Sequence, residues 1–123
     1  MSKYHSKKVT VDGITFDSKR EANRYRELSL LEKAGTISHL KRQVRFPLLP
    51  AVYEEYERTS PKSGKPLKNG RRCVERAVYY VADFCYTQDE KTIVEDVKGH
   101  RTKEYILKRK MMRFFHGIEV KEI

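Results

Sequence analysis

The stretch YYVADFCYTQDEKTIVEDVKG, residues 79–99, decides the fold. Two runs rich in β-branched and aromatic residues, at about 74–86 and 92–98, flank the polar segment TQDEK. Runs of this composition are typical of β-strands, and a short polar link between two of them is typical of a turn. The stretch therefore predicts a β-hairpin.

Two acidic residues and a lysine stand near the end of this hairpin. Side chains alternate along a strand, so Asp96 and Lys98 share one face while Glu95 lies on the other. If Asp83 pairs near Asp96, two carboxylates face each other, which costs free energy unless a cation lies between them. Mg²⁺ and Mn²⁺ prefer oxygen ligands, and the carbonyl of Val97 is one more. Lys98 would then orient an attacking water or neutralise charge on a phosphate.

The same spacing leaves a second interpretation open. Asp96 and Lys98 are also placed for an ordinary ion pair on a solvated strand face, which contributes less than ~1 kcal/mol. Asp83 would then only accept hydrogen bonds from the backbone. An Asp-x-Lys triplet arises often by chance, so these residues alone do not decide between the two interpretations.

Residues 16–35, FDSKREANRYRELSLLEKAG, form the clearest helix of the sequence. Ser18 and Glu21 fit a capping box, in which the Glu21 carboxylate reaches back to the helix start. Glu21 also lies on the same helix face as Tyr25 and Leu28, four and seven positions on. This face must point at the sheet, so Glu21 is a candidate to join the metal site.

The remaining segments complete an α/β order. An Asp-Gly pair in VTVDGITFDS predicts a short N-terminal hairpin, and Pro47 places the strand over 37–50 near a sheet edge. A basic helix over 101–117 and a strand over 118–123 follow the central hairpin. Residues 57–72, rich in Pro, Gly, Ser and Lys, predict a long flexible basic loop.

The composition indicates a partner of opposite charge. The 123 residues carry 27 Lys and Arg against 17 Asp and Glu, a net charge of +10. Such an excess is typical of nucleic-acid binders, although charge also serves solubility alone. Two cysteines without metal-type spacing favour a reducing compartment. No apolar run is long enough to span a membrane or serve as a signal peptide, so we expect a soluble cytoplasmic protein.

Taken together, these residues resemble the PD-(D/E)xK nuclease superfamily, which includes restriction endonucleases and Holliday-junction resolvases. FDSKREANRY, LLEKAGTISHL, YVADFCY and VEDVKGHRTKEY are similar to a family of small phage-encoded proteins long described as of unknown function. The resemblance covers residues 12–123, one nuclease domain after a basic N-terminal arm at residues 1–11. It implies a restriction-endonuclease-like αβββαβ core, with a central mixed four-stranded sheet flanked by helices.

The resemblance also implies roles for single residues. Asp83 takes the place of the motif's first acid, Asp96 of its second and Lys98 of its lysine. Glu21 matches an acid on the first core helix, and Gln43 matches a polar residue near the site. Ala82 stands where the motif has proline. Members of the superfamily commonly hydrolyse DNA phosphodiesters with Mg²⁺, for which Mn²⁺ often substitutes.

The basic segments predict the DNA-binding surface, because lysine and arginine contact phosphates whatever the base sequence. No second DNA-reading module is evident, so we expect recognition of branched DNA, as in a phage enzyme acting on recombination intermediates in the host cytoplasm. Two symmetric cuts in a four-way junction would require a homodimer. A non-catalytic DNA-binding module and a nuclease for single strands or ends are the alternatives. Besides Gln43, the candidate contacts are Lys62, Lys65, Lys68, Arg71, Arg72, His100, Arg101, Thr102, Lys103, Lys108 and Arg109.

Overall fold

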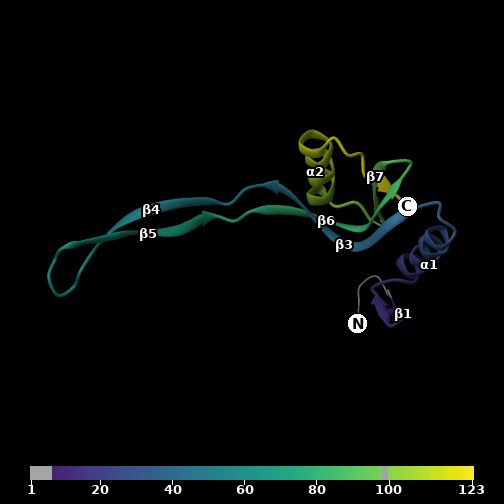
Figure 1. Cartoon of the computed structure of the whole chain (residues 1–123), viewed down its shortest axis with the longest axis horizontal. Coiled ribbons are helices and arrows are strands. Elements are labelled where there is room, and N and C mark those ends of the chain that lie inside the picture. Colours follow the sequence, from purple (N-terminus) through teal and green to yellow (C-terminus); the bar gives the residue numbers. More distant parts are fainter. Residues whose placement is uncertain (1–6, 98–99) are drawn as a thin grey trace.

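The computed structural model describes residues 7–97 and 100–123 (Figure 1). A body of sheet and helices carries one long projection. The elements in chain order are β1 (Val9–Val11), β2 (Ile14–Phe16), α1 (Lys19–Lys33), β3 (Ser38–Leu49), β4 (Val52–Thr59), β5 (Pro66–Glu75), β6 (Val78–Gln88), β7 (Lys91–Asp96), α2 (Lys103–Met111), the π-helical turn η1 (Met112–His116) and β8 (Lys121–Glu122).

The central sheet has four strands in the order β3-β6-β7-β8. β3, β6 and β7 are antiparallel neighbours, and β8 runs parallel to β7, so the predicted mixed four-stranded sheet is confirmed. β3 lies at the edge, as its proline predicts. The predicted hairpin is β6–β7. Its two-residue turn, Asp89 and Glu90, has positive φ at both positions, which matches the right-handed twist of paired strands.

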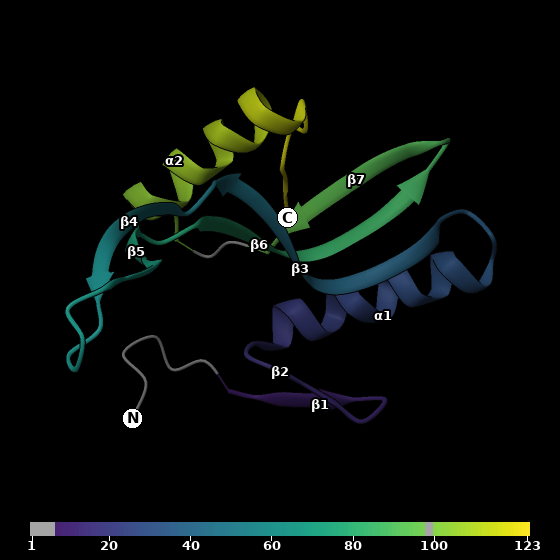
Figure 2. The same ribbon diagram turned by 60° about the vertical axis from the view of Figure 1, so that its left-hand side comes forward.

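The two helices pack on different stretches of this sheet (Figure 2). Phe84 and Tyr86 are buried in one apolar cluster with Leu28 of α1. Tyr80 and Ala82, earlier in the same strand, belong to a second cluster with residues of α2 and η1. Side chains two positions apart normally point to one face. The side chains of β6 therefore pack with α2 and η1 up to Ala82 and with α1 from Phe84 onward. Asp83 lies between these two stretches.

α1 begins where the sequence predicts, but part of its predicted apolar face is exposed. The Ser18 hydroxyl accepts a hydrogen bond from the Glu21 backbone N–H at 3.1 Å, which caps the helix. Ala22 and Leu28 are fully buried. Leu30 and Leu31, which the spacing also assigns to the apolar face, are exposed near the end of the helix. The buried face is therefore shorter than the helix.

The short N-terminal hairpin is confirmed, with Asp12 and Gly13 at positive φ in the turn between β1 and β2. Val9–Val11 is its first strand, so the hairpin begins before the domain boundary expected at residue 12. Residues 1–6 of the expected basic N-terminal arm lie outside the described chain. Both cysteines are free, and no described helix is long and apolar enough to cross a membrane.

The irregular loop predicted over 57–72 is wrong. β4 and β5 pair in antiparallel register as a two-stranded ribbon that projects from the body (Figure 1). The turn at its tip is closed by backbone hydrogen bonds between Ser60 and Lys65 and between Gly64 and Ser60, at 2.9 and 2.8 Å. Proline and glycine suggested a loop, but Pro66 begins a strand and Gly70 lies beneath the ring of Tyr56.

Candidate active site

Three polar side chains from three elements meet at the position where β6 changes its packing. Gln43 of β3 lies between two carboxylates. Its Nε2 atom is 3.4 Å from Glu21 Oε1 of α1 and 3.4 Å from Asp83 Oδ1 of β6. The backbone of Gln43 has φ of 51°, a left-handed conformation that costs free energy for a non-glycine residue. Such backbone strain occurs preferentially at functional sites.

The two carboxylates of this group repel each other. Glu21 is 7% exposed. Burial, followed by the negative charge of Asp83, raises the pKa of Glu21 above its usual value, while Arg42 and the Gln43 amide lower it by smaller amounts. A buried carboxylate beside a second negative charge is stabilised by binding a proton or by a nearby cation. The group therefore has the charge and the oxygen donors that suit a divalent cation.

Glu21→Gln tests this charge repulsion. A raised pKa means that the folded state binds the proton more tightly than the unfolded state. The wild type therefore loses stability as the pH rises through the folded-state pKa of Glu21. We expect Glu21→Gln to be more stable than the wild type at pH 7 without metal, and the difference to vanish below the unfolded pKa of Glu21. Denaturant unfolding at both pH values checks this, and equal stability at pH 7 would contradict it.

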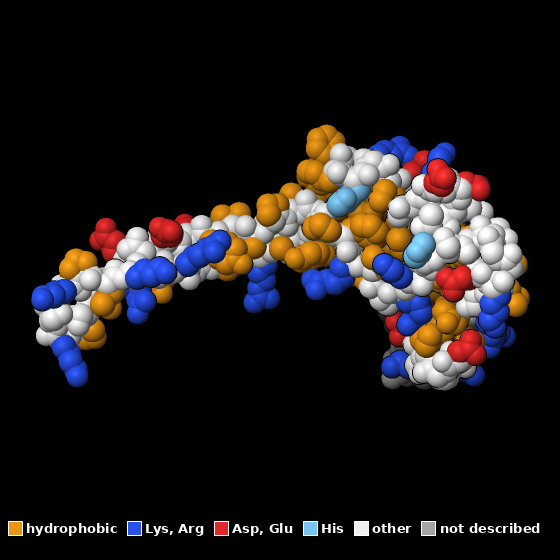
Figure 3. Space-filling model, viewed as in Figure 1, with side chains coloured by type: hydrophobic (Ala, Val, Ile, Leu, Met, Phe, Trp, Pro, Cys, Tyr) orange, Lys and Arg blue, Asp and Glu red, His pale blue; other side chains and the backbone are white. Residues whose placement is uncertain are grey.

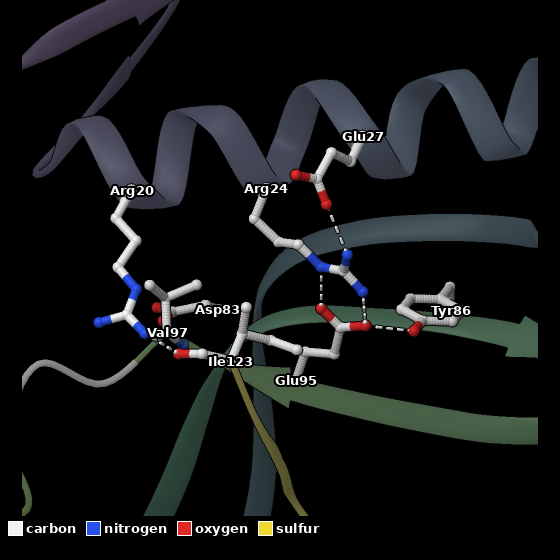
Figure 4. Close-up of polar contacts among 8 residues, drawn as sticks. All are labelled: Arg20, Arg24, Glu27, Asp83, Tyr86, Glu95, Val97 and Ile123. Carbon is white, nitrogen blue, oxygen red and sulfur yellow. Dashed lines mark hydrogen bonds and ion pairs between the residues drawn. The ribbon is translucent and has the colours of Figure 1, made fainter.

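Asp83 is held by the end of β7. Its Oδ2 atom accepts a hydrogen bond of 2.9 Å from the backbone N–H of Val97 (Figure 4). The pairing of β6 with β7 ends at Phe84 and Glu95, so Asp83 and Asp96 are the next residues beyond the last pair on each strand. That the two acids face each other across the hairpin stays a prediction.

Asp96 is 1% exposed and lies toward the α2 cluster. One of its carboxylate oxygens accepts a hydrogen bond from the hydroxyl of Tyr80. Burial first, then the bond and charge of Asp96, and more weakly Tyr105 and Asp83, raise the pKa of Tyr80. The phenol therefore stays protonated and remains a donor to Asp96.

Glu95 points away from Asp96, as the alternation predicts, and it has a structural role. Its two carboxylate oxygens accept hydrogen bonds of 2.7 Å from the Nε and Nη2 atoms of Arg24, and one of them also accepts from Tyr86 (Figure 4). Glu95 is fully buried. This bidentate pair joins α1 to β7 directly beside the candidate site. The sequence carries no signal for this pair, because Arg24 and Glu95 are 71 positions apart.

The backbone around Asp96 is fixed by the last strand. The N–H of Ile123 donates a 2.9 Å hydrogen bond to the Asp96 carbonyl. The Ile123 carbonyl accepts one of 2.9 Å from Arg20 of α1 (Figure 4). These two hydrogen bonds connect α1, the end of β7 and the residue that follows β8.

The structure brings together most of the predicted site. Glu21, Gln43 and Asp83 are in contact through the Gln43 amide, and Val97 contacts Asp83 through its backbone N–H. Lys98 lies outside the described residues. Within residues 7–97 and 100–123, no three His, Cys, Asp or Glu side chains form a complete metal-binding group. The arrangement is thus an acidic pair, Glu21 and Asp83, bridged by the Gln43 amide.

The predicted DNA contacts fall into two regions. Near α2, Arg101 and Arg109 form ion pairs with Glu122, and Lys108 pairs with Glu104. The Thr102 hydroxyl caps α2 by accepting from the Tyr105 N–H at 3.1 Å, so its side chain has a structural use. His100 and Lys103 are exposed beside it. The remaining candidates, Lys62, Lys65, Lys68, Arg71 and Arg72, are all exposed on the ribbon or at its tip.

The fold and the acidic group define a small mixed α/β protein with a candidate acidic centre between its first long helix and its central sheet. The chain belongs to the family described as a protein of unknown function, DUF1064, whose model matches residues 1–121. No curated protein and no solved structure matches the chain.

Proposed function

We propose that this protein is a Mg²⁺-dependent DNA endonuclease with the restriction-endonuclease-like core of the PD-(D/E)xK superfamily. The observation that carries the proposal is the convergence of Glu21, Gln43 and Asp83, from three separate elements, at the end of the β6–β7 pairing, where the buried Asp96 ends β7. A protein that only binds DNA gains nothing from acids in this position, because they repel phosphate.

The donor set fits a hard divalent cation. Glu21 and Asp83 supply carboxylate oxygens that a proton or cation would stabilise. Asp96 supplies a third carboxylate, whose orientation Tyr80 fixes. A bound Mg²⁺ or Mn²⁺ would polarise the phosphate and lower the pKa of a bound water. The chain's own part is to hold these oxygens in place, through the Val97 N–H on Asp83 and the Gln43 amide between Asp83 and Glu21.

In this proposal Lys98, two positions after Asp96 in the sequence, acts on the water or the phosphate. Branched DNA is the expected substrate, with single strands or ends as the alternative, and a homodimer would supply two symmetric cuts. The net charge of +10 supports an anionic polymer as substrate.

Cleavage of a labelled four-way junction, a linear duplex and a single strand in Mg²⁺ tests the proposal. Lys98→Ala should lower the cleavage rate by about 10²–10³-fold, the size expected when one group that stabilises charge in the transition state is removed. Lys91→Ala, which changes an exposed lysine at the start of β7, should cleave like the wild type. Tight binding without cleavage in Mg²⁺ or Mn²⁺ would establish a non-catalytic DNA-binding module instead.

A further inference from the structure

The β4–β5 ribbon, Val52–Glu75, has no partner in the described chain along most of its length. Every residue of its two strands is exposed except Gly70. Apolar side chains lie on it, among them Tyr53, Tyr56 and Leu67, each between 42% and 49% exposed. An isolated two-stranded hairpin is at best marginally stable in water, and large exposed apolar groups mark interaction surfaces. Both features predict that a binding partner covers the ribbon.

Charge is divided along the ribbon. Its base holds the acids Glu54, Glu55 and Glu57, with Glu75 on the returning strand. Residues 58–68, which form the end of the ribbon beyond Glu57, contain four Lys and Arg and no acid. Basic side chains continue to the tip (Figure 3). The outer half of the ribbon is therefore strongly cationic.

The basic residues of the ribbon have two different environments. Arg71 stacks on Tyr53 at 4.0 Å from the ring centroid, and Arg72 contacts Glu54 at 3.4 Å. These arginines pair across the ladder with Glu55 and Glu54, so they are partly neutralised and help to hold the ribbon together. Beyond them lie Arg58, Lys62, Lys65 and Lys68. We call these four residues the tip cluster.

We propose that the ribbon lies in a groove of duplex DNA and that the tip cluster contacts phosphates about eight base pairs beyond the body. The major groove of B-DNA admits a two-stranded β-ribbon. The eight residues of β4, at ~3.3 Å each, span about 26 Å, or about eight base pairs at ~3.4 Å. The substrate class of the proposed nuclease would then be DNA with a duplex arm. This inference rests on the proposed function, because the nuclease site defines where the DNA is cut relative to the ribbon.

Charge favours DNA over a second copy of the chain as the occupant. The partner must meet a surface with several positive charges and no negative charge near its end. A second copy carries a net charge of +10 and would repel this surface, whereas phosphates attract it. Exposed tyrosines between the cations add apolar contact with sugars and bases.

Two double variants with equal loss of charge test the inference. Lys62→Gln with Lys65→Gln removes half of the tip cluster, and Lys33→Gln with Lys91→Gln removes two exposed charges on parts of the body far from the ribbon (Figures 1 and 2). Binding of duplexes of about 6 base pairs, closed by a hairpin loop, and of about 30 base pairs is measured in Ca²⁺ over a range of salt. The tip variant should lose roughly 60-fold in affinity for the long duplex at 0.1 M salt, and its salt slope should fall by about 1.8.

The short duplex provides the internal control, because about six base pairs at ~3.4 Å span only about 20 Å, less than the about 26 Å of β4, and cannot contact the body and the tip together. There the tip variant and the Lys33/Lys91 variant should bind alike. Equal affinities of the two variants for the long duplex would overturn the inference, as would a change in self-association of the tip variant by sedimentation, which would indicate a second copy as occupant. Loss of long-duplex binding by the tip variant in a protein that never cleaves DNA would leave the ribbon inference standing and remove the nuclease.

Discussion

Asp83→Asn is expected to lower the rate of Mg²⁺-dependent DNA cleavage by at least ~10³-fold while DNA binding in Ca²⁺ stays within about threefold. Asparagine keeps the shape of the side chain and an oxygen that can accept from the Val97 N–H. It removes the negative charge that the proposed cation needs. The variant also removes the charge that raises the pKa of Glu21, so the folded protein should be no less stable.

Asp89→Asn is the matched control, since it makes the same chemical change in the turn between β6 and β7, at the other end of the same strand. Both variants are compared by single-turnover cleavage. The substrate is the one that the wild type cleaves fastest among the four-way junction, the linear duplex and the single strand. If Asp83→Asn cleaves as fast as Asp89→Asn, the acidic group is not the catalytic centre. A loss of DNA binding together with cleavage would place Asp83 in substrate binding.

Arg24→Ala is expected to lower the free energy of unfolding by about 3–5 kcal/mol and the melting temperature by roughly 10–20 °C. Arg24 gives two hydrogen bonds of 2.7 Å to Glu95, which is fully buried. Without the guanidinium, the Glu95 carboxylate keeps only the Tyr86 hydroxyl among these contacts and remains shielded from water. Breaking a buried ion pair at one partner is far more costly than removing both partners.

Two further variants separate this cause from a general effect on the helix. Arg26→Ala changes an exposed arginine of α1 that bonds only to Asn23 of the same helix in the described contacts, and it should cost less than about 0.5 kcal/mol. Adding Glu95→Gln to Arg24→Ala should recover part of the loss, because the buried charge is then removed. A double variant as unstable as the sum of both single variants would show that the ion pair itself is not the source.

Local chemistry made much of the fold predictable. The Asp12-Gly13 pair places the N-terminal hairpin, and Ser18 marks the start of α1, because each depends on residues close in the sequence. The alternation of Glu95 and Asp96 also separated their two environments correctly. These features follow from the period of a strand or from the geometry of a turn.

The rest depended on contacts that the sequence does not display. The ribbon was missed because proline, glycine and lysine favour loops, whereas its strands form by pairing with each other along an exposed ladder. The left-handed backbone of Gln43 has no sequence signal of its own. The sequence around Glu21 fits a capping box as well as a contact with the sheet. Only the position of β3, which brings Gln43 to Glu21, decides between the two roles.

The ribbon leaves and re-enters the sheet at adjacent positions, since Leu49 of β3 pairs with Val78 of β6. The residues between them can therefore be shortened to a tight turn without opening any ladder of the central sheet, and the chain entropy of closing the connection changes little with its length. In evolutionary terms the ribbon is an exchangeable attachment. A change in its length or charge would leave the contacts among Glu21, Gln43 and Asp83 in place.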